Sequence, residues 1–187
     1  SINRASSAGY PYNTYVTKSG KWDIFGDGQD FDLNTPLCKQ LKEEVTAIIE
    51  QLKKGERPLF FFMDCLKDEL RADSKIEKCS TRLFSGSPVA YVVVFLMFLG
   101  KFISFYLELR FSLGSAIGVN PFSTEWNVLA KQLLSKGRHI IAGDFAGFDA
   151  TQYSMILQKF IDMINRWYGD SLENQRIREL IWHEVWN

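Results

Sequence analysis

The sequence predicts an α+β fold. Segments with apolar residues at helical spacing alternate with short apolar runs of strand length. The 187 residues correspond to one domain or a little more, at about 150 residues per domain. A composition of 46% hydrophobic and 24% charged residues excludes collagen, a coiled coil and wholesale disorder. Aromatic residues make up 14% of the chain, which is enough to fill a sizeable core.

The first elements follow from local signals. Four glycines among aromatic residues predict loops and short strands over residues 1–34. Thr35 is then a suitable N-cap, Pro36 suits the first helical position, and Gly55 ends the predicted helix. The apolar residues of this helix are Leu37, Leu41, Val45, Ile48, Ile49 and Leu52. Residues 59–63 form a short apolar run that suits a buried strand.

Residues 89–109 are almost continuously apolar. A membrane span needs about 20 apolar residues with few charges, and here Gly100 and Lys101 interrupt the run. We therefore expect a buried helix and no direct membrane span, with a spanning helix as the alternative.

The last third of the chain predicts three helices and one strand. A helix capped by Ser123 ends before Gly137, and residues 140–142 suit a short apolar strand. A strongly amphipathic helix then ends near Gly169, and a last helix begins near Ser171. The apolar face of the first of these helices consists of Trp126, Leu129, Ala130, Leu133 and Leu134.

Charge and cysteine content limit the possible sites. The 22 Lys and Arg residues balance the 22 Asp and Glu residues, so any polyanion site must be local. Three cysteines without a CxxC pair, beside two histidines, predict neither a disulfide framework nor a zinc site, and indicate a reducing compartment. The chain lacks an initiator methionine and an apolar face continues to its end. We therefore expect a piece of a larger protein.

One candidate site is a turn that carries two carboxylates. The apolar residues 140–142 lead into Asp144, and Asp149 follows after a glycine-containing turn. In α/β architectures ligands collect beyond the carboxyl ends of strands, and a carboxylate there suits Mg²⁺. The alternatives are a solvated turn for Asp144 and, for Asp149, a capping box with Gln152.

A second candidate is the cationic segment over residues 67–82. Its cations are Lys67, Arg71, Lys75, Lys78 and Arg82. They are three or four residues apart and alternate with acidic residues, which also suits a solvated helix with salt bridges. The functional interpretation is that they hold a triphosphate or RNA phosphates.

A third candidate is the segment SSAGYPY over residues 6–12. Its small residues allow a nucleic-acid strand to approach the backbone, and its hydroxyls and amides can bond phosphates. The alternative is a turn that carries tyrosines.

In this order, the three segments resemble the viral RNA-dependent RNA polymerases of the picornavirus-like order, most nearly those of dicistroviruses and related insect viruses. Residues 6–12 resemble motif G, at the template entry. The segment KDELR through Arg82, residues 67–82, resembles motif F, the basic fingers element. DFAGFD, residues 144–149, resembles motif A of the palm, and residues 114–126 (GSAIGVNPFSTEW) are also similar to the family pattern.

The resemblance implies a fragment of a right-hand polymerase. Residues 1–137 correspond to the fingers region, and residues 138–187 to the start of the palm, with its first strand and helices. The Ser-Gly motif B and the Gly-Asp-Asp motif C do not occur in the sequence. Because the chemistry needs a further carboxylate, we expect the chain alone to be inactive.

The resemblance also implies roles for individual residues. Asp144 matches the carboxylate that binds the catalytic metals, with the carbonyl of Phe145 beside it, and Asp149 matches the residue that recognises the ribose hydroxyl. The residues implied to bind the nucleotide are Lys67, Arg71, Lys75 and Arg82. Those implied to bind the template are Ser6, Ser7, Gly9 and Tyr10. Motif F is extended and looped in the family, which Cys79, Ser80 and Thr81, as poor helix formers, favour over a helix.

The implied reaction is ribonucleotidyl transfer, in which a primer 3′-hydroxyl attacks the α-phosphorus of a ribonucleoside triphosphate and pyrophosphate leaves. The implied cofactor is magnesium, used as two ions, with manganese as the alternative. The implied partners are RNA template and primer, ribonucleoside triphosphates and other viral replication proteins, at membrane-associated complexes in the host cytoplasm. The alternatives are a non-catalytic RNA-binding or scaffold module, a membrane-anchored replication protein and, less favoured, a reverse transcriptase or DNA polymerase.

Overall fold

The computed structural model describes residues 2–185, apart from the side chain of Asp149. These residues form two compact units, each with its own core. Unit 1 comprises residues 2–98 and 172–185, and unit 2 comprises residues 99–171. The units are defined by packing, whereas the predicted boundary after residue 137 separates functional regions. That assignment of fingers and palm therefore stays a prediction.

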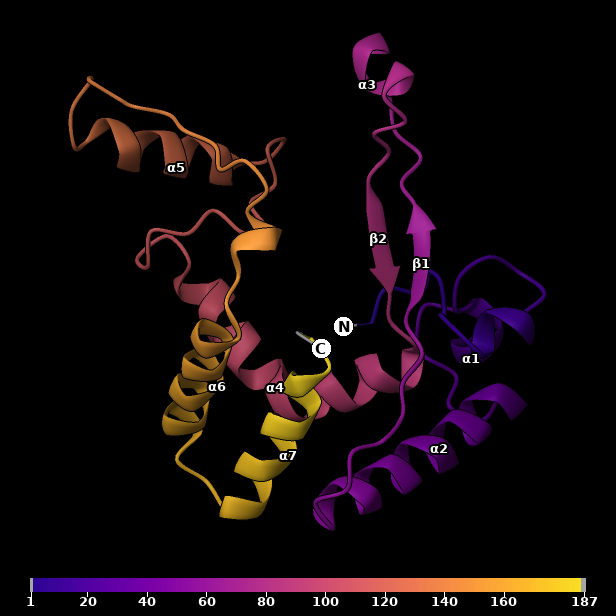
Figure 1. Cartoon of the computed structure of the whole chain (residues 1–187). Helices are drawn as coiled ribbons and strands as arrows, with labels where there is room; N and C mark the ends of the chain where they lie inside the picture. Colours follow the sequence, from indigo (N-terminus) through magenta and orange to yellow (C-terminus); the bar gives the residue numbers. More distant parts are fainter. Residues whose placement is uncertain (1, 186–187) are drawn as a thin grey trace. The chain divides into compact units, whose positions relative to one another are not determined.

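Unit 1 contains most of the helices and the only strands of the described residues (Figure 1). Its complete helical elements are η1 (Tyr12–Thr14), α1 (Trp22–Phe25), α2 (Pro36–Lys53), α3 (Asp73–Glu77) and α7 (Leu172–His183). Its strands are β1 (Met63–Leu66) and β2 (Leu83–Gly86), which form an antiparallel hairpin. The expected helix near Ser171 is thus confirmed as α7.

Helix α2 confirms its sequence signals. The Thr35 hydroxyl oxygen accepts a hydrogen bond from the backbone N–H of Cys38 at 3.1 Å, which satisfies one of the free donors at the helix start. Four residues of the predicted apolar face, Leu41, Val45, Ile48 and Leu52, are buried, Leu37 and Ile49 are half-buried, and α2 packs against α1 and α7. The core of unit 1 includes Tyr12, Ile24, Leu41, Val45, Leu52, Val89, Val94, Ile177 and Ile181.

The prediction of a buried strand over residues 59–63 is wrong. The strand begins only at Met63, and the side chain of Leu59 is 78% exposed. Phe60 and Phe62 instead make edge contacts with the ring of Tyr91, at centroid distances of 5.0 and 5.2 Å. Aromatic packing against a helix therefore replaces strand pairing here.

Helix α4 (Val89–Leu109) runs from unit 1 into unit 2. It buries one stripe, which includes Tyr91, Val94, Leu99 and Phe102. Its length and composition suffice to cross a membrane, and 33% of its most apolar window is buried inside the protein. A core helix of a soluble protein meets the same criterion, so the choice between a buried and a spanning helix stays a prediction.

Unit 2 contains α5 (Thr124–Leu134), η2 (Asp149–Thr151) and α6 (Ser154–Tyr168). The predicted Ser123 cap is confirmed, because its hydroxyl accepts from the N–H of Glu125 at 3.2 Å. The predicted end of α6 is confirmed as well, since Gly169 follows it in the left-handed conformation. The apolar face of α5 is not covered in unit 2, where Trp126, Leu133 and Leu134 are exposed.

The predicted palm strand over residues 140–142 is not formed. These residues are irregular and exposed, and Ile141 is 99% exposed. A strand exists only where a neighbour accepts its ladder hydrogen bonds, and no segment of the described chain pairs with this one. The apolar sequence alone therefore does not produce the strand.

Candidate nucleic-acid interface

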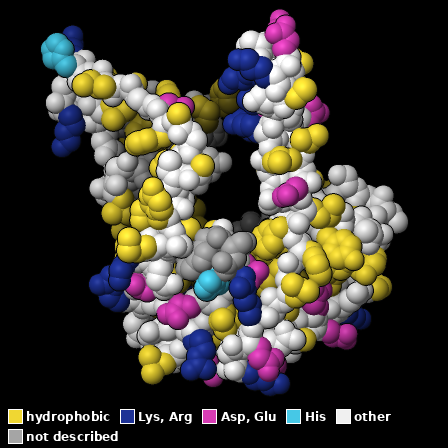
Figure 2. All heavy atoms as spheres, in the orientation of Figure 1, with side chains coloured by type: hydrophobic (Ala, Val, Ile, Leu, Met, Phe, Trp, Pro, Cys, Tyr) yellow, Lys and Arg dark blue, Asp and Glu magenta, His cyan; other side chains and the backbone are white. Residues whose placement is uncertain are grey.

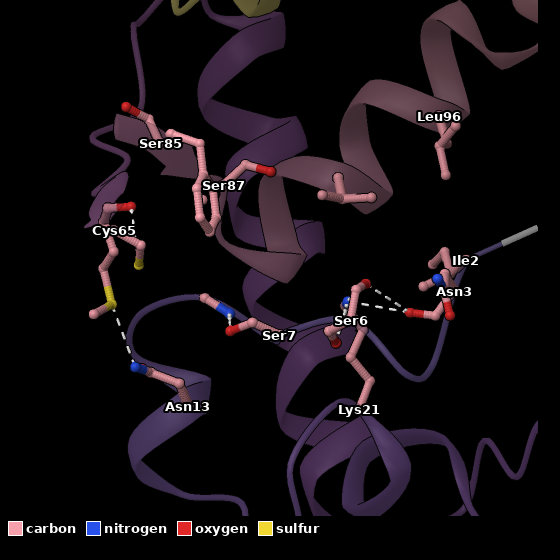
Figure 3. A pocket seen from close by; sticks show the side chains of 15 residues that line it. Ile2, Asn3, Ser6, Ser7, Asn13, Lys21, Cys65, Ser85, Ser87 and Leu96 are labelled. Carbon is pink, nitrogen blue, oxygen red and sulfur yellow. Dashed lines mark hydrogen bonds between the residues drawn. The ribbon is translucent and has the colours of Figure 1, made fainter. Parts of the chain in front are cut away.

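A cavity of about 560 Å³ lies in unit 1, lined by the N-terminal loop, the base of the β1–β2 hairpin and the start of α4 (Figure 3). Three of the four predicted template residues, Ser6, Ser7 and Gly9, line this cavity. The fourth, Tyr10, is not among its lining residues, and its ring makes an edge contact with Phe61 at 5.8 Å. The structure thus brings part of the motif G-like segment to a cavity shared with the base of the hairpin, through Met63, Cys65 and residues 84–87, whereas no residue of the motif F-like segment 67–82 lines it.

A glycine is required at position 9 because the backbone of the protein itself packs closely against it. Its φ is +69°, and a Cβ there would lie 2.4 Å from the carbonyl oxygen of Ser87 and 2.7 Å from Cα of Pro88. The adjacent carbonyl of Ala8 accepts a hydrogen bond from Val89 N–H at 2.8 Å. The close approach expected between Gly9 and a nucleic acid is therefore made by the chain's own backbone.

Lys21 is a buried cation in the cavity wall, with 4% of its surface exposed. Its ammonium donates to the carbonyl of Asn3 at 3.2 Å and, within Ser6, to the carbonyl at 2.9 Å and the hydroxyl at 2.7 Å. Burial lowers the pKa of this ammonium. Sequence patterning missed Lys21, since nothing local marks a lysine as buried.

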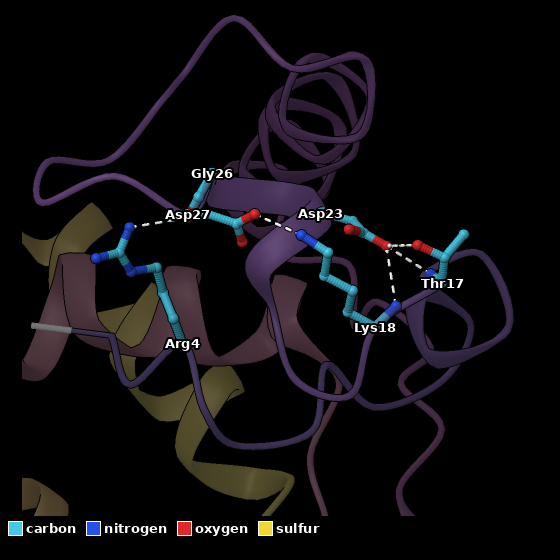
Figure 4. A network of polar contacts seen from close by, with 6 residues as sticks. All are labelled: Arg4, Thr17, Lys18, Asp23, Gly26 and Asp27. Atoms are coloured by element: carbon cyan, nitrogen blue, oxygen red, sulfur yellow. Dashed lines mark hydrogen bonds and ion pairs between the residues drawn. The ribbon is translucent and has the colours of Figure 1, made fainter.

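Arg4 fixes the other side of the same loop (Figure 4). Its guanidinium donates to the carbonyl of Gly26 at 2.8 Å and lies 4.9 and 5.0 Å from the ring centroids of Trp22 and Phe31. Such cation–π contacts add to the hydrogen bond. The N-terminal loop is therefore held by two cations, Arg4 and Lys21, whose donors point to protein groups.

The hairpin brings three predicted cations together around one carboxylate. Glu69 accepts from Nε of Arg82 at 2.7 Å and forms a second, very short contact with Nη2 of the same residue. Its oxygens also lie 3.3 Å from Nζ of Lys67 and 3.4 Å from Nη1 of Arg71. Three cations around one anion leave a local excess of positive charge.

The carboxylate is strongly stabilised in its ionised form. The hydrogen bond from Arg82, followed by that from Lys67, lowers the pKa of Glu69 to about 2. Sequence analysis counted Glu69 only as a charge that offsets the cations. The signal was the spacing of two between Lys67, Glu69 and Arg71, which places them on one face of an extended chain.

The segment between the strands is mostly extended, with a helix only over α3. A continuous helix is thus excluded, and the looped interpretation is confirmed on both sides of α3, where residues 67–72 and 80–82 are irregular and residues 78–79 form a turn. Lys75 lies on α3 and is not part of the Glu69 cluster. Figure 2 shows Lys and Arg side chains gathered near the outer end of this hairpin.

Asp144 lies in unit 2, in an exposed irregular segment that leads into the turn over residues 146–148, and the ring centroids of Phe145 and Phe148 are 5.6 Å apart. The side chain of Asp149 lies outside the described residues. Its backbone begins η2, and α6 starts only at Ser154, so the alternative of a capping box for Asp149 is wrong. Whether Asp144 meets the hairpin cations of unit 1 stays a prediction of the resemblance.

The donor set at Asp144 suits a hard cation. A carboxylate and the neighbouring backbone carbonyl of Phe145 supply oxygen ligands, the kind that Mg²⁺ and Mn²⁺ prefer. Among the residues that the structure describes, no three His, Cys, Asp or Glu side chains form a metal-binding group. Asp144 and Phe145 therefore fit as part of a metal site and need further ligands to complete it.

Comparisons with known proteins agree with the resemblance. The family described as "Viral RNA-dependent RNA polymerase" matches residues 1–185. The replicase polyprotein of Acute bee paralysis virus (strain Rothamsted) is 34% identical over 188 residues, which cover 100% of this chain and 10% of that polyprotein. The replicase polyprotein of Drosophila C virus (strain EB) is 36% identical over 157 residues, covering 83% of this chain and 9% of the polyprotein.

The fold is also shared with a solved structure. The Sicinivirus 3Dpol RNA dependent RNA polymerase is similar with a TM-score of 0.74 at 21% identity. The similarity covers 96% of this chain and 36% of that one. The expected fold, a fragment of a viral polymerase, is therefore confirmed, and the chain spans about a tenth of the length of the polyproteins it matches.

Proposed function

The chain belongs to the viral RNA-dependent RNA polymerase family, and from this premise we propose that it forms part of an enzyme that performs template-directed ribonucleotidyl transfer. One observation carries the proposal: the family match over residues 1–185 includes all three motif-like segments in order. The partners are then RNA template and primer, ribonucleoside triphosphates and other viral replication proteins.

In this proposal the hairpin binds the incoming triphosphate. Lys67, Arg71 and Arg82 are held together by Glu69, and Lys75 lies beyond them on α3. Arginine offers a planar fork to phosphate oxygens and lysine a point charge, so the cluster can neutralise several phosphate oxygens at once. Its support is that Lys67, Arg71 and Arg82 share one carboxylate, within a segment that carries five cations and four acidic residues.

Asp144 and the carbonyl of Phe145 would hold magnesium, or manganese in its place. When bound there, the metal would supply positive charge that stabilises the attacking and leaving oxygens of the displacement. The role of Asp149 is to accept a hydrogen bond from the ribose hydroxyl, so that a deoxy sugar leaves a polar group unpaired. These roles rest on the match of Asp144–Asp149 to motif A.

The decisive test uses the full-length polymerase that contains this chain, with primed RNA, magnesium and four ribonucleotides. Asp144→Asn is expected to abolish nucleotide incorporation while RNA affinity changes less than about twofold. Asp162→Asn, which removes the same charge from a half-buried position of α6 where the carboxylate contacts Gln158 and Lys159 of the same helix, is the control and should retain synthesis. Normal turnover by Asp144→Asn would remove Asp144 from the metal site.

Three further outcomes bear on the proposal. Robust synthesis by the 187-residue chain alone would contradict the need for further carboxylates. Salt-dependent RNA binding by the full-length protein without any synthesis would favour the RNA-binding or scaffold alternative. Preference for deoxyribonucleotides would favour a DNA-synthesising enzyme.

We also propose that the enzyme works in the host cytoplasm at membrane-associated replication complexes. The support is the family alone. Flotation of the full-length protein with lipid vesicles, in the presence and absence of other replication proteins, tests it. Flotation of the protein by itself, lost on introducing charges into α4, would instead favour a membrane anchor.

A further inference from the structure

The serines of the N-terminal loop have different hydrogen-bonding states. The Ser6 hydroxyl accepts from the ammonium of Lys21 at 2.7 Å and donates to the carbonyl of Asn3 at 3.0 Å. A hydroxyl has one proton, so that of Ser6 is already used inside the protein. The Ser7 hydroxyl accepts from Gly9 N–H at 3.2 Å, and its proton has no acceptor within residues 2–185.

All hydrogen-bond donors of the Lys21 ammonium are also used within the protein. An ammonium has three donors, and its three acceptors are the carbonyls of Asn3 and Ser6 and the Ser6 hydroxyl. No carboxylate of the described chain pairs with it. Bringing an unpaired ammonium out of water is unfavourable, so its retention here requires these three hydrogen bonds. Lys21 therefore shapes the loop and has no donor left for a ligand.

The loop is tied to the rest of unit 1 on both sides of the serines. Its entry is fixed by Arg4 and by the bond from Lys21 N–H to the Arg4 carbonyl at 2.7 Å. Its exit is fixed by the close contact of Gly9 with Ser87. Between these points Ser7 faces the cavity as an exposed residue (Figure 3).

We propose that Lys21 is a positioning residue, which holds the loop so that Ser7, and not Ser6, donates its hydroxyl proton to a phosphate of the RNA template. This inference rests on the proposed polymerase function, which supplies the ligand. Its new content is the division of labour: Lys21 and Ser6 belong to the wall, and Ser7 contacts the ligand.

The first test compares variants of the full-length polymerase by fluorescence anisotropy with a single-stranded oligoribonucleotide. Ser7→Ala is expected to weaken binding about tenfold, because a hydrogen bond to a charged group is lost. Ser7→Thr keeps the hydroxyl and should bind within about twofold of the wild type. Equal affinity of Ser7→Ala and the wild type would overturn the inference.

The second test separates positioning from direct contact. Lys21→Met is expected to weaken binding about tenfold, and adding Ser7→Ala should weaken it less than about twofold more, because the loop is already displaced. The dependence of affinity on salt should be unchanged. A fall of about 0.7 in the slope of log K against log salt would show that Lys21 itself contacts a phosphate, and would overturn its positioning role.

If Lys21→Met does not fold, Ser6→Ala takes its place, since it removes one acceptor of the ammonium. It should likewise be non-additive with Ser7→Ala, and full additivity would refute the coupling. These binding experiments can fail without affecting the proposed polymerase function. If Ser7→Ala binds RNA normally while Asp144→Asn abolishes synthesis, this inference fails and the proposed function stands.

Discussion

Replacing Gly9 by alanine tests the packing that forms the cavity wall. The residue has φ +69°, where an alanine costs about 1–2 kcal/mol more than a glycine. The new Cβ would also lie 2.4 Å from the Ser87 carbonyl oxygen and 2.7 Å from Cα of Pro88. Both are backbone atoms that no rotamer change can move, so overpacking adds about 1–3 kcal/mol. We expect a loss of about 2–5 kcal/mol in the free energy of unfolding.

Gly55→Ala is the matched control within unit 1. Gly55 has φ +80°, and the nearest atoms to an added Cβ belong to the flexible side chain of Arg176, at 3.5 Å. Only the conformational cost of about 1–2 kcal/mol applies there. Urea unfolding of both variants, extrapolated to water, measures the difference. Equal destabilisation of the two variants would refute the close approach of Gly9 to Ser87.

Three further changes test other parts of unit 1. Thr35→Ala should destabilise the protein by about 1–2 kcal/mol in urea unfolding, because α2 loses its cap; an unchanged midpoint would contradict the capping role. Tyr91→Phe removes the 3.0 Å hydrogen bond to the buried Ile181 carbonyl and should cost about 1 kcal/mol in the same assay, whereas no loss would mean that water replaces the hydroxyl. The low pKa of Glu69 means that its stabilisation of the hairpin is complete above the ordinary value of 4.5 and is lost as pH falls toward about 2. The protection factors of the hairpin amides, meaning the intrinsic divided by the observed exchange rate at each pH, should therefore fall over that range in the wild type and be low already at neutral pH in Glu69→Gln, and a flat profile would argue against the cluster.

The helices could be predicted because their signals are local. Thr35 and Ser123 cap the helices that follow them, and Gly169 ends α6, as the sequence indicates. These signals depend on side chains a few residues away, so they act whatever surrounds the helix.

The strands could not be placed in the same way. The runs over residues 59–63 and 140–142 have suitable composition, yet a strand also needs a partner at hydrogen-bonding distance. Phe60 and Phe62 pack on Tyr91, and residues 140–142 have no pairing segment in the described chain. Strand pairing depends on segments far apart in the sequence, so the composition of one segment does not predict it.

The sequence predicted most of the residues of the candidate site, but it did not predict which of them contact one another. Three of the four template residues line one cavity, and three of the four nucleotide cations meet at Glu69. The roles of Glu69 and Lys21 were missed because each depends on hydrogen-bond partners that only folding brings close. Glu69 lies opposite Arg82 only once the hairpin forms, and Lys21 is buried only once the loop folds over it.

The two kinds of cation in unit 1 show where phosphate can bind. Lys21 is buried and its donors are saturated by groups of the loop, so an incoming phosphate gains nothing from it directly. Arg82 and Lys67 are about half exposed and share one carboxylate with Arg71. Glu69 itself is only 17% exposed, whereas the Arg82 and Lys67 side chains still reach solvent, so a polyanion can bind them while Glu69 stays in place. The hairpin is therefore suited to reversible phosphate binding, whereas the loop is suited to holding a fixed shape.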